Sequence, residues 1–99
     1  MLVIMGTIRL PPERLDAARG PMTAMATATR AEDGCIHYAY AEDVMDRGLV
    51  RISEIWRDQA ALDLHFKTAH MADWRATWPD LAIHDRQITA YDAANPRSV

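Results

Sequence analysis

The order of apolar patterns along the chain predicts an α+β fold of the ferredoxin-like type, β-α-β-β-α-β, with a four-stranded antiparallel sheet and helices on one face. Four short segments are apolar at alternate positions or almost throughout, which is typical of strands. Two longer segments repeat apolar residues at spacings of three and four, which is typical of helices. Turn-forming Gly or Pro residues lie at most of the junctions between them.

The composition describes one soluble domain. The 99 residues are 49% hydrophobic and 25% charged, as in an ordinary globular protein. A net charge of −3 gives no attraction for nucleic-acid phosphates or anionic membranes, so we expect neither as a partner. Cys35 is the only cysteine, which excludes an intrachain disulfide, and the first ten residues lack the features of a secretion signal. We therefore expect a cytoplasmic protein.

The first strand and the first helix have the clearest patterns. Residues 2–10 are apolar on both alternating faces and end at Pro11-Pro12, which predicts a central strand covered on both sides. A helix is expected over residues 12–30, and Gly20-Pro21 should bend or loosen it near its middle. Its buried stripe is predicted to consist of Leu15, Ala18, Met22, Met25 and Thr29.

The second strand follows a turn that contains Gly34, a residue suited to positive φ. A strand that begins at Cys35 places Cys35 and His37 on one face and Tyr38 and Tyr40 on the other. Neither face is clearly polar. The alternation leaves open whether the tyrosines line a cavity or a subunit interface.

A hairpin signal over residues 46–48 (Asp-Arg-Gly) separates the second strand from a third over residues 49–57. In the third strand, Glu54 and Trp56 alternate onto one face. Asp58 is a good N-cap for a second helix, whose apolar spacing continues to Pro79.

The last strand is expected over residues 81–91, which completes a single domain over residues 1–92 before a polar tail over residues 93–99. One sheet face carries no helix in this fold. Because the strands are apolar on both faces, we expect the helix-free face to pack against a second copy in a homodimer. A chain of this length buries only about 60–65% of its unfolded surface, which also favours burial against a partner.

One group of residues could carry chemistry. His65, about two turns into the second helix, is expected on the helix face that packs against the sheet, near Glu54 and Trp56. A carboxylate beside an imidazole fixes its tautomer and raises its basicity, which would make a base for an acidic phenol. The alternative is a buried pair that only locks the helix to the sheet.

Other candidate residues give weaker signals. Trp74 and Trp78, four residues apart, are typical of core packing but would also suit the walls of a pocket for a flat aromatic ligand. His65 and His70 have four residues between them, not the three that place two metal ligands on one helix face. We therefore expect no metal site.

Three motifs resemble the antibiotic biosynthesis monooxygenase family, small proteins that include quinol monooxygenases. They are TIRLPPE at the end of the first strand, EDGCIHYAY, and EIWRDQAALDLHFKTAH, which is similar to the family's E-x-W…A-L…H…H segment. The resemblance covers nearly the whole chain, and it implies a ferredoxin-like domain that forms a dimeric α/β-barrel.

The resemblance also implies a function. Known members oxidise electron-rich phenols or hydroquinones with O₂ and without flavin, metal or haem, so it implies a cofactor-independent monooxygenase acting on a quinol or a polyketide-like aromatic. His65 would be the base, or a hydrogen-bond partner of the substrate, and Glu54 its orienter. The residues expected to bind the substrate are Trp56, Phe66, Trp74, His70, Tyr38 and His37.

Two departures and one alternative limit this interpretation. Haem-degrading and polyketide-oxidising members use an active-site Asn, whereas the only asparagine here is Asn95 in the tail, which argues against haem degradation. The same fold also serves non-oxygenase roles. The alternative is a non-catalytic, small-molecule-binding or stress-response barrel.

Overall fold

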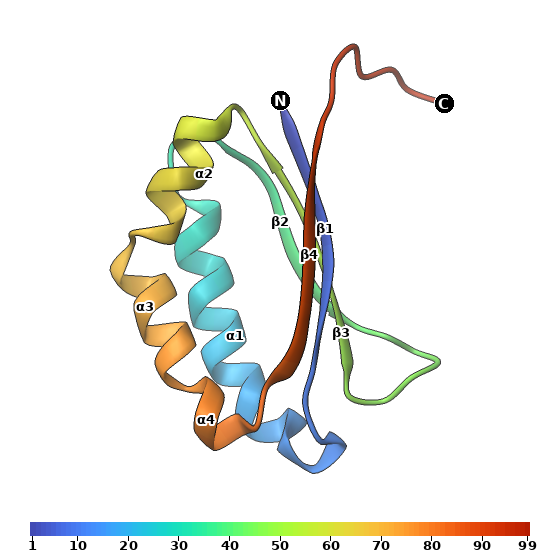
Figure 1. Cartoon of the computed structure of the whole chain (residues 1–99), viewed down its shortest axis with the longest axis vertical. Coiled ribbons are helices and arrows are strands. Elements are labelled where there is room, and N and C mark those ends of the chain that lie inside the picture. Colours follow the sequence, from blue (N-terminus) through green and yellow to red (C-terminus); the bar gives the residue numbers. More distant parts are fainter.

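The structure, a computed structural model, describes residues 1–99. Its elements are β1 (Leu2–Arg9), η1 (Pro12–Arg14), α1 (Leu15–Arg30), β2 (Cys35–Glu42), β3 (Leu49–Trp56), α2 (Gln59–Phe66), α3 (Ala69–Ala76), α4 (Trp78–Leu81) and β4 (His84–Asp92). The strands form one antiparallel sheet in the order β2-β3-β1-β4. Figure 1 shows the helices on one side of the sheet and none on the other. The predicted ferredoxin-like fold is confirmed.

β1 is a central strand, as its apolar pattern predicts, because it pairs with both β3 and β4. Leu2, Ile4 and Ile8 on one face of β1 are buried under the helices. Met5, on the opposite face, is 54% exposed. Within a single chain, β1 is therefore covered on the helix side only.

α1 buries its whole predicted stripe against the rest of the core. Pro21 lies inside this helix, which nevertheless continues from Leu15 to Arg30 as one α-helical element. The irregular part is instead the start, where Pro12–Arg14 form the separate 3-10 turn η1. None of the helices is both long enough and apolar enough to span a bilayer.

The second helical region differs from the single helix expected up to Pro79, because it is divided into α2, α3 and α4. Asp58 caps α2 as predicted, and its carboxylate accepts a 2.9 Å hydrogen bond from the backbone N–H of Ala61. Thr68 caps α3 by accepting from the backbone N–H of Met71. A second cap of this kind starts a new helix with a new direction.

Two details of the strands also differ from the prediction. Leu81 belongs to α4, which ends at Ala82 with a left-handed φ of 54°, so β4 begins only at His84. In β2, an irregular register between Cys35 and His37 inserts one extra residue. Cys35 therefore packs against the core, whereas strict alternation predicts it on the face of His37.

Candidate functional site

A cavity of about 300 Å³ lies between the sheet and the helices α2, α3 and α4. The aromatic side chains that line it are Tyr38, Tyr40, Phe66 and Trp78. The polar side chains that line it are Glu54, His65, Arg75 and Arg86. Both tyrosines of β2 thus face the cavity, which answers the question that alternation leaves open. A partly open cavity of this size, with aromatic and aliphatic walls and a few polar groups, suits a small aromatic molecule.

His65 is held by Glu32 and not by Glu54. Nδ1 of His65 lies 2.7 Å from Oε2 of Glu32, and because a carboxylate oxygen only accepts, Nδ1 carries the proton. The predicted Glu54–His65 pair is wrong: Glu54 accepts a 2.8 Å hydrogen bond from the indole Nε1 of Trp56. Trp56 is two residues away on the same strand face and is therefore the nearer partner.

The same oxygen of Glu32 also accepts a hydrogen bond from Nε2 of His70, at 2.8 Å. On one unbroken helix, residues five apart would point about 140° away from each other. His65 is in α2 and His70 is in α3, so the break between the two helices changes their relative phase. The spacing argument, which holds for a single helix, therefore does not separate these two histidines.

Glu32, His65 and His70 are the residues that could hold a metal ion, since one ligand atom from each lies within 4.8 Å of the others. Hydrogen bonds already account for this cluster, with two imidazole N–H donors on one carboxylate oxygen. This arrangement leaves neither imidazole N–H nor that oxygen unsatisfied. We interpret the cluster as a support that fixes the His65 ring.

The second ring nitrogen of His65, Nε2, is available to a ligand. Nε2 has no hydrogen-bond partner in the chain. The side-chain nitrogens that are both fully buried and without a partner are Nε1 of Trp74 and Nε1 of Trp78. Nε2 of His65 is not among them, so it is open to the cavity that His65 lines. Burial lowers the pKa of His65, and the hydrogen bond to Glu32 opposes this only in part. The ring is thus neutral at pH 7 with a lone pair on Nε2, the form of a general base.

Glu54 is only 6% exposed and lines the cavity beside aromatic rings. Burial raises its pKa, while the hydrogen bond from Trp56 and the positive charge of Arg86 act in the opposite direction. One of its oxygens is committed to Trp56, and the other has no partner in the chain. Glu54 can therefore exchange a hydrogen bond or a proton with a bound molecule.

The comparisons with known proteins agree with this fold. The family model described as antibiotic biosynthesis monooxygenase matches residues 1–77. The chain belongs to the antibiotic biosynthesis monooxygenase family. A candidate monooxygenase of Mycobacterium tuberculosis is 36% identical over 78 residues, which are 79% of this chain and 76% of that protein. An uncharacterised protein of Synechocystis is 29% identical over 98 residues, 99% of this chain and 67% of that protein.

Solved structures of the antibiotic biosynthesis monooxygenase family share the fold over nearly the full length. A candidate family member from Deinococcus radiodurans superposes with a TM-score of 0.92 at 29% identity, covering 100% of this chain and 98% of that chain. The structure of a Mycobacterium tuberculosis protein has a TM-score of 0.84 at 30% identity, with 98% of each chain covered. The resemblance found in the motifs is confirmed.

Four residues that were expected to bind substrate lie outside the cavity lining. Trp56 and Trp74 are buried in the core behind it. His70 contacts Glu32 instead. His37 lies on the opposite side of the sheet, where its Nε2 is 2.9 Å from Oγ of Ser53. Of the expected residues, the cavity lining contains Glu54, His65, Phe66 and Tyr38.

Sequence reasoning missed three residues of this family member's site. Glu32 gave only a weak signal, as the acidic residue of the turn before the second strand. Arg75 and Arg86 gave none, because one lies in a helix and the other in a strand where an exposed arginine is ordinary.

Proposed function

We propose that this family member is a cofactor-independent monooxygenase that oxidises an electron-rich phenol, a hydroquinone or a polyketide-like aromatic with O₂. The observation that supports this best is the state of His65. Its ring is neutral and is held by Glu32, and its free Nε2 opens into a cavity with aromatic walls. Such a group removes the proton from a bound hydroxyl. Family membership and the names of the relatives support a monooxygenase-like function in general.

In the proposed reaction, His65 takes the phenolic proton, and the phenolate passes an electron directly to O₂. Bond formation between the reduced oxygen and a ring carbon, followed by loss of water, produces a quinone. One atom of O₂ becomes the new carbonyl oxygen, and the other leaves as water with the hydrogens lost from the ring carbon and the hydroxyl. The walls of Tyr38, Tyr40 and Phe66 keep bulk water from the intermediates.

Glu54 has a different role in this proposal from the one expected from the motif. Its uncommitted oxygen faces the cavity, so we assign it as a hydrogen-bond partner of the substrate or of the oxygen adduct. Glu32 takes over the orientation of His65. His65 and Glu54 remain the proposed catalytic pair, although they do not contact each other through a hydrogen bond.

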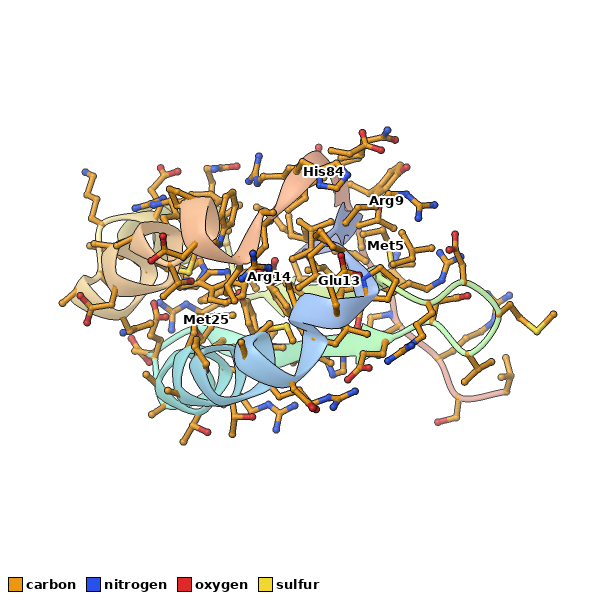
Figure 2. The ribbon with its side chains drawn as sticks, turned by 90° about the horizontal axis from the view of Figure 1, so that it is seen from below. Met5, Arg9, Glu13, Arg14, Met25 and His84 are labelled. Carbon is orange, nitrogen blue, oxygen red and sulfur yellow. The ribbon has the colours of Figure 1, made fainter.

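The test is O₂ uptake with a panel of naphthols and hydroquinones. His65→Gln should lower the rate by at least about 100-fold, the contribution of a general base. His84→Gln changes an exposed histidine at the start of β4, labelled in Figure 2, and should leave the rate unchanged. Absence of uptake by the unmodified protein across the panel would contradict turnover and favour simple ligand binding. Loss of activity after treatment with EDTA would contradict cofactor independence.

We also infer a homodimer that forms through the helix-free face of the sheet. Met5, labelled in Figure 2, and Tyr91 are on this face and are 54% and 55% exposed. Large apolar side chains on an open sheet face favour burial against a second copy. Met5→Asp should convert the dimer to a monomer in size-exclusion chromatography with light scattering. A monomeric unmodified protein would contradict the inference.

A further inference from the structure

We infer that the cavity selects an aromatic molecule that carries a carboxylate, which Arg86 and Arg75 bind while the hydroxyl group of the molecule faces His65. This inference rests on the proposed function for the identity of the hydroxyl end. It adds a second recognition point and so narrows the substrate class to aromatic acids that also carry a phenolic hydroxyl.

Neither guanidinium group of the cavity lining forms an ion pair within the chain. Arg86 makes no hydrogen bond or ion pair, and Nη2 of Arg75 donates only to the backbone carbonyl of Phe66, at 3.1 Å. By contrast, Arg9 and Arg51 each pair with an aspartate, at 2.7 and 2.8 Å. An arginine without a carboxylate partner keeps its planar set of donors free for a two-point contact with a carboxylate.

The charge balance of the lining also favours an anion. Two arginines face one carboxylate, Glu54, and His65 is neutral, so the lining keeps a positive excess even when Glu54 is ionised. The chain as a whole carries a net charge of −3. The cavity is therefore a local site of attraction on a protein that otherwise repels anions.

Trp78 supplies a flat wall beside the two arginines. Its side chain lines the cavity together with Arg75 and Arg86, and an indole ring packs favourably against an aromatic molecule. Trp78 and Arg86 lie beyond residues 1–77, which the family model matches.

The experiment measures binding of a matched pair, 6-hydroxy-2-naphthoate and 2-naphthol, by isothermal titration calorimetry without O₂. The unmodified protein should bind the naphthoate about tenfold more tightly, the size of one hydrogen bond between charged groups. Arg86→Gln and Arg75→Gln should each remove most of this preference and leave the affinity for 2-naphthol within about twofold.

Arg14→Gln is the matched control, because Arg14 is an exposed arginine of η1 with no acidic partner, labelled in Figure 2. It should leave the preference unchanged. Equal affinities for the two probes, or no binding of the naphthoate, would overturn the inference, as would an equal loss in Arg14→Gln. Since binding is measured without turnover, a preference for the naphthoate in a protein that consumes no O₂ would contradict the proposed function alone.

Discussion

Glu32 and Glu54 are two carboxylates of the same site, and they differ in what their oxygens contact. One oxygen of Glu32 accepts from both His65 and His70, and Glu32 does not line the cavity. Glu54 accepts from a single indole and has its second oxygen free beside the cavity. A carboxylate with committed hydrogen bonds positions its neighbour, whereas one with a free oxygen is available to a ligand.

The largest effect should come from Glu32→Gln, which removes the charge that holds the His65 ring and its tautomer. We expect kcat for naphthol oxidation to fall about 100- to 1,000-fold, or about 3–4 kcal/mol, with little change in KM. Glu13→Gln, at an exposed carboxylate of η1 labelled in Figure 2, should have no effect. A rise in KM with unchanged kcat would contradict the positioning role of Glu32.

Gly34→Ala should destabilise the turn that carries Glu32. Gly34 has a φ of 86°, and an added Cβ would lie 2.6 Å from Cβ of Ala61. The left-handed conformation and the overlap together should lower the free energy of unfolding by about 2–3 kcal/mol, measured by urea denaturation. Gly20→Ala, where an added Cβ would meet nothing within 4 Å, should change it by about 1 kcal/mol or less.

The pH dependence of the rate should separate the two carboxylates. Burial lowers the pKa of His65 below 6.5, so kcat/KM should be level near pH 7 and fall about tenfold per unit below that lowered pKa. The hydrogen bond from His65 to Glu32 raises the pKa of His65, so Glu32→Gln should move the midpoint to lower pH. Glu54→Gln should leave the midpoint in place, and an equal shift in both variants would contradict the assignment.

Fluorescence must confirm that the protein is folded at each pH of this profile. The unfolded chain binds a proton at His65 more readily than the folded chain, since folding lowers this pKa. Stability is therefore lost as the pH falls below about 6.5.

The smallest effect is a gain in stability from Glu54→Gln. Burial raises the pKa of Glu54 above 4.5. The ionised carboxylate therefore lowers the free energy of unfolding at pH values above the folded-state pKa of Glu54. This loss of stability is absent at pH values below the unfolded-state pKa. The amide keeps an acceptor for Trp56, so the free energy of unfolding should rise by about 1 kcal/mol at pH 8. The gain should vanish near pH 4. A loss of stability at pH 8 would show that the charge of Glu54 supports the fold.

Much of the fold was predictable because local rules govern it. The stripe of α1, the cap at Asp58 and the central position of β1 follow from spacing and from residue type. The site was partly predictable in the same way, since alternation along β3 and helical spacing in α2 direct Glu54 and His65 toward one space. The family motifs then indicated the kind of chemistry.

The sequence by itself thus determined the order of the elements, the sheet that they form and the faces that carry Glu54 and His65. Only the tertiary structure decided which carboxylate holds the imidazole. A cap at Thr68 restarts the helix, which brings His70 around to the partner of His65. Glu32 reaches both from a turn distant in the sequence, 33 residues before His65. Periodicity describes one element at a time, whereas the contacts of this site depend on where separate elements meet.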